Sequence, residues 1–295
     1  MNFKRLSTRA PEYPELLKHI FDPPGLLNVW GNMPDLNEHP PIAIVGSRKP
    51  TDYGRENAVN IAKGLAKAGF AIISGLAYGI DSIAHKVSLE AEGITVAVLG
   101  SGLNNIYPVS HKKLAEDIVN NRGAVISELD DTMPGLPHHF PKRNRIISGM
   151  SLGIIVIEAA INSGTLITAR SALEQGREVF AVPGPIGNVN TAGTHRLIRE
   201  GAALIESAQD AIDILDNKLP KPWKAKFSGQ SFGIGDKERK LLDLLDECRL
   251  SLDEMVEKSG LASQNVLAAI TVLEASGLIK EDGGKYRKSK KGSLT

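Results

Sequence analysis

The segment IAIVGSRKPTDYG, residues 42–54, combines the features of a phosphate-binding turn. Its first four residues form an uncharged apolar run, which predicts a buried strand of a parallel sheet, and Gly46, Ser47 and Arg48 follow directly. From Tyr53 the apolar positions recur with helical spacing, so we expect a helix there. The free N–H groups and the dipole of a helix start attract anions, and a guanidinium can add a bidentate phosphate contact. This turn is therefore predicted to be one edge of a phosphate-binding site.

The densest basic cluster of the chain is FPKRNR, residues 140–145. Taken alone, such a cluster is as often a solvated helix face as a binding site. Two features favour binding: an aromatic residue lies beside the cations, as expected where bases stack next to a phosphate track, and the cluster falls at a βα crossover that can reach the rim of Arg48. The candidate residues are Phe140, Lys142, Arg143, Asn144 and Arg145.

Other predicted strand ends carry small or polar residues as well. In residues 74–81, SGLAYGID, Gly79 permits a sharp turn or a close approach of the backbone to a ligand. Asp81 in the same segment is interpreted as a helix N-terminal residue rather than a catalytic acid. Gly164 and Thr165 open another helix, where an anion seat and a plain N-cap are equally good interpretations.

Apolar runs alternate with helical patterns from residue 42 to about residue 215, which predicts βαβ units: an α/β domain with a parallel sheet and helices on both faces. Ligands of such sheets bind at the carboxyl ends of the strands. Strands are expected at 42–45, 70–73, 94–99, 124–126, 153–157, 178–182 and 203–205. Helices are expected near 53–68, 79–91, 110–121, 142–150, 165–175, 194–200 and 207–215.

The flanking segments complete the predicted organisation. Residues 1–41 are proline-rich and are interpreted as a lead-in that packs on the sheet, with one short helix at 14–20 and one strand at 26–30; residues 42–215 form the main domain. The remaining predicted parts are a linker at 216–235, a small C-terminal winged-helix domain at 236–288 and a disordered tail at 289–295.

The third helix expected in the winged domain, residues 263–276, contains no Lys or Arg. A helix that reads duplex DNA normally brings cations to phosphates, so this helix does not match that role. Lys280, Lys285, Arg287 and Lys288 leave wing contact with DNA open, and a protein-contact or packing role is at least as good an interpretation.

Composition excludes several classes of protein. The 35 Lys and Arg residues balance 34 Asp and Glu residues, so a nucleic-acid site must be local rather than a property of the whole charge. Cys248 is the single cysteine, which argues against a disulfide framework or a cysteine metal site, and no cofactor or metal is expected. No signal peptide and no membrane-length apolar run is found, so the default compartment is the cytoplasm. Neither a P-loop nor the dinucleotide fingerprint follows a predicted strand.

The segments GSRKPTDYG, SGLAYGIDSIAH, FPKRNRIISG, SGTLITA and VFAVPG, in this order, resemble the DprA (Smf) family of DNA-processing proteins over about residues 11–215. The resemblance implies an extended Rossmann-like fold and sequence-independent binding of single-stranded DNA. It also implies protection of incoming DNA and loading of the RecA recombinase for homologous recombination during natural transformation. By motif position, the family's basic pocket would include Arg48 and Lys142, with Ser47, Gly79 and the neighbourhood of Arg143 and Arg145 close by.

The sequence departs from the family at two places. It carries no helical N-terminal domain of the kind that some members have, and His195 stands where Asn is expected in many members.

Two further hypotheses stay beside that of a non-enzymatic binding protein. A nucleotide-hydrolysing enzyme of the lysine-decarboxylase-like phosphoribohydrolase type would use Glu158 near a glycine-rich turn, but the P-G-G-x-G-T-x-x-E arrangement is absent. An assembly factor would use apolar helices within 164–215 as a homodimer face and an acidic patch to hold RecA, and this role is compatible with binding single strands.

Overall fold

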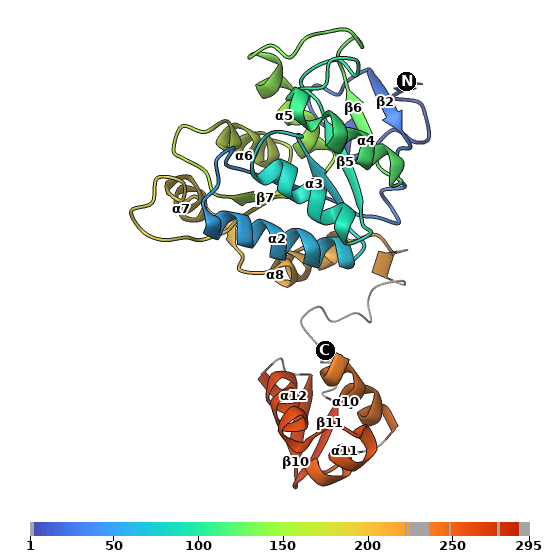
Figure 1. Cartoon of the computed structure of the whole chain (residues 1–295), viewed down its shortest axis with the longest axis vertical. Helices are drawn as coiled ribbons and strands as arrows, with labels where there is room; N and C mark the ends of the chain where they lie inside the picture. Colours follow the sequence, from blue (N-terminus) through green and yellow to red (C-terminus); the bar gives the residue numbers. More distant parts are fainter. Residues whose placement is uncertain (1–2, 222, 225–235, 248, 276–277, 289–295) are drawn as a thin grey trace. The chain divides into compact units, whose positions relative to one another are not determined.

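The structure, a computed structural model, describes residues 3–221, 223–224, 236–247, 249–275 and 278–288 (Figure 1). The chain divides into two compact units, Met1–Gln230 (unit 1) and Ser231–Thr295 (unit 2), each with its own apolar core.

Unit 1 is built on a nine-stranded sheet within its described residues, in the order β1-β2-β6-β5-β4-β3-β7-β8-β9. All pairs from β6 to β9 are parallel, so the predicted parallel sheet is confirmed, while β1 and β2 add an antiparallel edge. The strands are β1 Phe3–Ser7, β2 Leu26–Gly31, β3 Pro41–Gly46, β4 Ala71–Ser74, β5 Ile94–Val98, β6 Ala124–Ser127, β7 Gly153–Ile157, β8 Glu178–Ala181 and β9 Ala203–Leu204.

Strand β1 was not predicted from the sequence. Its residues, FKRLS, contain two cations and no apolar run, and only Leu6 is buried. It gains its structure by pairing with β2 at the sheet edge, where charged side chains are common because they discourage further strand pairing. The lead-in therefore contributes two strands to the sheet rather than one.

Helices cover both faces of the sheet, as predicted. Helix α3 packs beside both α2 and α4, and α5 packs beside α6 (Figure 1). Alternate residues of the strands enter two different cores: Val96 and Val98 belong to one and Ala97 to the other, which is the period of two that a sheet imposes. The helices are α1 Glu15–Lys18, α2 Asp52–Lys67, α3 Ile80–Glu90, α4 Lys112–Asn120, α5 His139–Gly149, α6 Gly164–Glu174, α7 Ala192–Arg199 and α8 Ala208–Leu215, with 3₁₀ turns η1 Val109–His111 and η2 Asp216–Lys218.

Unit 2 contains α10 Asp236–Glu247, α11 Leu252–Ser259 and α12 Ser263–Ala275, followed by the hairpin of β10 Ile279–Asp282 and β11 Lys285–Lys288. The hairpin turns at Gly283 and Gly284, whose φ angles of 63° and 78° are those of a tight primed turn. Three helices and a two-stranded wing make the winged-helix arrangement that the sequence predicts.

The segment predicted to be a linker begins with residues that pack on unit 1. After η2, the Trp223 indole N–H donates to the Ala68 carbonyl over 2.9 Å, and its ring meets Phe70 edge-on at 5.2 Å. The rest of the predicted linker, residues 225–235, and the predicted tail, 289–295, lie outside the described residues.

A buried histidine makes the stability of unit 1 depend on pH. The Thr95 hydroxyl donates to the Ile72 carbonyl, so the 2.6 Å contact between Thr95 and His85 requires Nδ1 of His85 to donate. Burial, together with the positive charges of His111 and Arg143, lowers the pKa of His85 to about 3.

We expect the unfolding free energy of unit 1 to fall as the pH drops below about 6.5. His85 then binds a proton in the unfolded chain but stays neutral in the folded chain. This group alone contributes about 1.4 kcal/mol per pH unit. Urea unfolding followed by the fluorescence of Trp30 and Trp223, the two tryptophans of the chain, reports on unit 1 alone. His85→Gln should remove the contribution of one proton from the slope of the unfolding free energy against pH. An unchanged slope would mean that His85 is not the source of this pH dependence.

Candidate nucleic-acid interface

A cavity of about 600 Å³ lies at the carboxyl ends of β3 and β7, between the starts of α3, α5 and α6. This is the edge where parallel α/β sheets place their ligands. The cavity is lined by Val45, Gly46, Ser47, Arg48, Ala77, Asp81, Tyr107, Pro137, Phe140, Pro141, Arg143, Asn144, Ile147, Ala160, Ser163, Gly164, Thr165, Thr168 and Asn190. The lining brings together predicted residues from segments that are more than 100 positions apart in the sequence.

The turn after β3 is held by its neighbours through the backbone. The Ile80 N–H donates to the Ser47 carbonyl over 3.1 Å, and the Thr165 hydroxyl donates to the Gly46 carbonyl, also over 3.1 Å. Gly79 has φ +77°, and a methyl group there would lie 2.2 Å from the carbonyl oxygen of Ser47. Glycine at position 79 therefore allows the loop before α3 to lie close to the turn after β3.

Arg48 and Phe140 meet at the mouth of the cavity. The guanidinium carbon of Arg48 lies 5.8 Å from the centre of the Phe140 ring, and Tyr107 places a second ring 5.5 Å from Phe140. Lys142 is exposed two residues further along α5. Arg48 therefore lies beside an aromatic pair suited to stacking, whereas Lys142 is exposed in the first turn of α5 and is not among the residues that line the cavity. Tyr107 was missed in the sequence because no basic cluster surrounds it.

Arg143 differs from the exposed cation that the sequence suggested, because only 5 % of it is exposed. Its guanidinium donates to the Gly75 carbonyl over 2.7 Å and to the Val98 carbonyl. Burial lowers the pKa of Arg143 to about 10, against the opposing effect of nearby Asp81, so it stays charged at neutral pH. Arg143 lies in the wall of the cavity and ties α5 to the ends of β4 and β5.

Asp81 lies at the start of α3 and is buried beside Arg143. It accepts hydrogen bonds from the N–H groups of Gly75, at 3.1 Å, and Ala77, at 3.4 Å. Burial raises the pKa of this carboxyl, and the charge of Arg143 opposes the rise. Asp81 organises the loop between β4 and α3, which agrees with the interpretation of Asp81 as a helix N-terminal residue.

Arg145 faces away from the cavity and is not among its lining residues. It pairs with Asp22 over 3.2 Å and with Glu128, and its side chain is 15 % exposed. Asn144, in contrast, does line the cavity. Consecutive helix residues point about 100° apart, so the cluster at residues 140–145 divides between two surfaces of α5.

Gly164 and Thr165 occupy the first turn of α6, which opens onto the cavity. Ser163 at the N-cap makes no side-chain hydrogen bond to the helix, and a methyl group at Gly164 would meet nothing within 4 Å. The amides at this helix start are therefore accessible to a ligand in the cavity.

Glu158, the residue that the enzyme hypothesis relied on, is buried and engaged. It accepts the Thr51 N–H over 2.9 Å and also the Thr51 hydroxyl, which in turn caps α2. A methyl group at Gly54 would lie 2.5 Å or less from the nearest Glu158 carboxyl atoms, so the helix start closes tightly over this side chain. Glu158 anchors the loop that carries Arg48, a role that no local pattern could reveal because Thr51 lies 107 residues away.

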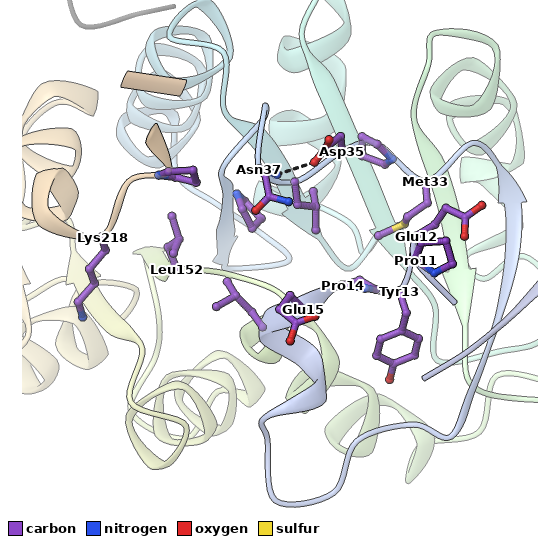
Figure 2. A pocket seen from close by; sticks show the side chains of 15 residues that line it. Pro11, Glu12, Tyr13, Pro14, Glu15, Met33, Asp35, Asn37, Leu152 and Lys218 are labelled. Carbon is purple, nitrogen blue, oxygen red and sulfur yellow. Dashed lines mark hydrogen bonds between the residues drawn. The ribbon is translucent and has the colours of Figure 1, made fainter. Parts of the chain in front are cut away.

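A second cavity, of about 540 Å³, lies at the amino ends of β3 and β7, beside Pro41 and Leu152 (Figure 2). Two of its polar side chains have partners: Asp35 accepts the Asn37 N–H over 2.8 Å, and Lys218 pairs with Glu178 over 2.5 Å. Several prolines form the rest of the wall. It offers fewer free cations and amides than the Arg48 cavity, so it is the weaker candidate.

The wing of unit 2 is not a free basic surface. Lys285 pairs with Glu254 over 3.2 Å, and Arg287 and Arg249 both approach Asp282. Lys285 and Arg287, two of the four cations considered for wing contact with DNA, therefore have acidic partners within unit 2, and Arg287 shares its partner with Arg249.

Within the described residues, no group of three or more His, Cys, Asp and Glu side chains could hold a metal ion. A search of the same part of the chain finds no helix with the length and apolarity needed to cross a membrane.

Known proteins match both units of the chain. Residues 4–216 match the family model of DNA recombination-mediator protein A, and residues 231–285 match the DprA winged helix domain. The chain is 40 % identical to Protein Smf of Escherichia coli over 93 % of its length and 74 % of the relative's. It is 42 % identical to DNA processing protein DprA of Bacillus subtilis, covering 71 % of this chain and 70 % of that one.

Solved structures show the same fold. DNA processing protein A of Streptococcus pneumoniae aligns with a TM-score of 0.68 and 43 % identity, over 72 % of this chain and 74 % of that one. A structure concerned with the single-stranded DNA binding mode of DNA processing protein A from Helicobacter pylori aligns with a TM-score of 0.65 and 30 % identity, over 74 % and 97 % of the two chains.

The close approach at Gly79 yields a test. Gly79→Ala adds a clash with Ser47 to the strain of a backbone conformation, φ +77° and ψ −126°, that L residues avoid, whereas Gly176→Ala, at φ +68° with nothing within 4 Å, adds backbone strain without a clash. We expect about 1–2 kcal/mol of destabilisation for Gly176→Ala and about 1–3 kcal/mol more for Gly79→Ala. Urea unfolding followed by tryptophan fluorescence measures both. Equal losses would mean that the two loops do not depend on this contact.

Proposed function

The chain belongs to the DprA/Smf family of DNA-processing proteins, and from this premise we propose that unit 1 binds single-stranded DNA without sequence preference at the Arg48 cavity. The observation that carries the proposal is the arrangement of Arg48 over the Phe140 ring, with Lys142 exposed on the same helix as Phe140. Cations that follow a backbone, beside a ring on which a base can stack, are the usual means of holding single strands.

The remaining site residues support this chemistry. The Ser47 carbonyl and the Thr165 hydroxyl hold the loops together, while the first amides of α6 face the cavity. Amides and cations contact phosphates, which carry no sequence information. Gly79 brings the two loops together, and Asn144 adds a polar side chain to the wall. Binding through such groups is expected to be alike for all sequences.

The finer biological role is also proposed. The protein would protect incoming DNA, load RecA onto it for homologous recombination during natural transformation, and act as a cytoplasmic homodimer. The relatives named DNA processing protein DprA support the setting in DNA processing. Light scattering of the purified chain tests the dimer, and a pull-down with RecA, with and without a bound strand, tests the loading role.

We propose that binding involves no turnover. In the enzyme hypothesis Glu158 would act on a nucleotide, but both of its carboxyl oxygens bond to Thr51 and it does not line the cavity. Incubation of the protein with nucleoside monophosphates should release no free base, and release of base would favour the enzyme.

The salt dependence of binding distinguishes the residues that contact phosphates. Each phosphate neutralised contributes roughly −0.7 to the slope of log affinity against log salt for single strands. We expect Arg48→Ala and Lys142→Ala each to weaken binding of oligothymidylate and mixed sequences alike. Each variant should also make the slope less negative by roughly 0.7, because one phosphate contact is lost. Fluorescence anisotropy over a salt series measures both quantities.

Lys63→Ala is the matched control, because Lys63 is an exposed cation far along α2 from the cavity. It should change neither affinity nor slope. If the double variant of Arg48 and Lys142 binds single strands as tightly as the unaltered protein, the cavity is not the binding site.

A further inference from the structure

Phe21 is the most exposed large apolar side chain among the described residues, with a relative exposure of 104 %. It lies in the loop between α1 and β2, where its neighbour Ile20 is buried. Single exposed apolar residues are common on protein surfaces, so exposure alone does not indicate a function. The way this loop is held is the more informative observation.

The loop is fixed on both sides of Phe21. On one side Ile20 packs with Leu17 against Gly149 in the last turn of α5, where a methyl group would lie 2.9 Å from Ile20. On the other side Asp22 pairs with Arg145 over 3.2 Å. An aromatic ring presented on a rigid support loses little conformational entropy when it is covered.

The next residues hold the loop as well. Pro23 and Pro24 restrict the backbone, and the buried Tyr13 hydroxyl donates to the Pro24 carbonyl over 2.6 Å. Burial raises the pKa of Tyr13 to about 12, so this donor keeps its proton at neutral pH.

The loop joins the same helix that contributes to the cavity. Lys142, Arg145 and Gly149 are spaced three and four residues apart, so they share one stripe of α5. Arg145 and Gly149 on that stripe contact the loop on either side of Phe21. Lys142 lies about 4.5 Å along the axis from Arg145, in the first turn of α5, where its neighbours Phe140 and Pro141 line the cavity.

We propose that Phe21 is a stacking platform for a nucleobase of the strand that leaves the Arg48 cavity along the Lys142 stripe of α5. The proposal rests on the proposed function and extends its site. The strand would be held by phosphate contacts at Arg48 and Lys142 and by a base on the exposed face of Phe21. Base–aromatic stacking accepts every base, since every base has a π-face, which agrees with binding that ignores sequence.

The surroundings of Phe21 favour a base over a protein partner. A protein surface normally covers a contiguous apolar patch. The adjacent exposed side chains, His19 and Asp22, are polar, and Asp22 shares its partner Arg145 with Glu128. An isolated flat ring next to a phosphate track matches a single base better than it matches a protein interface.

The test uses the full chain and oligothymidylates of about 4 to about 16 nucleotides, the range that single-strand sites cover. We expect Phe21→Ala to weaken binding of the longer strands about 5- to 20-fold and to leave the shortest unchanged, because the shortest do not reach the loop. The slope against salt should not change, since stacking releases no counterions. Phe21→Trp should bind as the unaltered protein does, and its fluorescence should be quenched by long strands.

Two controls isolate the base. Ile214→Ala removes a 44 % exposed apolar side chain on α8 and should have no effect. Strands with abasic sites should bind the Phe21→Ala variant and the unaltered protein equally tightly. A loss that persists with abasic strands would overturn the proposal, and so would a loss of self-association in light scattering without a loss of strand binding.

The outcomes also separate this proposal from the one it rests on. If Arg48→Ala and Lys142→Ala weaken binding while Phe21→Ala binds all lengths normally, the platform is wrong and the cavity stands. If none of these variants alters binding, the proposed function fails as well.

Discussion

The buried guanidinium of Arg143 joins the parts of unit 1 that form the candidate site. From α5 it donates to carbonyl groups at the ends of β4 and β5, and Asp81 at the start of α3 lies close enough to offset part of the cost of burying its charge. A buried charge is stable only when it is paired and its donors are used. This requirement fixes where α5 begins relative to the strand ends, and therefore where Phe140 and Lys142 lie relative to Arg48.

The positions of the groups that line the cavity depend on other polar groups whose hydrogen bonds are made within the protein. Glu158 holds Thr51 and so fixes the loop that carries Arg48, and Thr165 holds the turn from the other side. Glycine at position 79 lets the two loops approach, because a side chain there would meet the Ser47 carbonyl. The groups left facing the cavity are those that suit an anionic chain: a guanidinium, helix amides and aromatic rings. A site of this kind needs no excess of positive charge in the whole protein, and the chain has almost none.

The charged residues of unit 2 are arranged differently. Helix α12 carries no cation, and the wing pairs Lys285 and Arg287 with acidic residues of the same unit. Family membership assigns this unit its fold, but its surface charges do not resemble those of winged helices that grip duplex phosphates. In unit 1, by contrast, Arg48 lies beside the rings of Phe140 and Tyr107 and forms no ion pair with an acidic side chain among the described residues.

Much of the fold could be predicted from the sequence because many of its elements depend on residues that are close together in the chain. The uncharged run before Gly46, the alternation of strands and helices, and the Gly283–Gly284 turn each depend on neighbouring residues, and these elements appear where they were expected. Strand β1 and the start of α5 at His139, three residues before the predicted start, do not follow from local pattern: β1 depends on pairing with β2, and α5 on packing across the sheet.

The sequence by itself determined that a Gly-Ser-Arg turn between a strand and a helix, a basic cluster with an aromatic residue, and a second small domain are present. Only the tertiary structure decided how the cluster divides, with Lys142 exposed, Arg143 buried and bonded to the ends of β4 and β5, and Arg145 paired with Asp22 and Glu128. The reason is geometric. Each step along a helix turns the side chain by about 100°, and which direction meets solvent depends on elements that lie far away in the sequence.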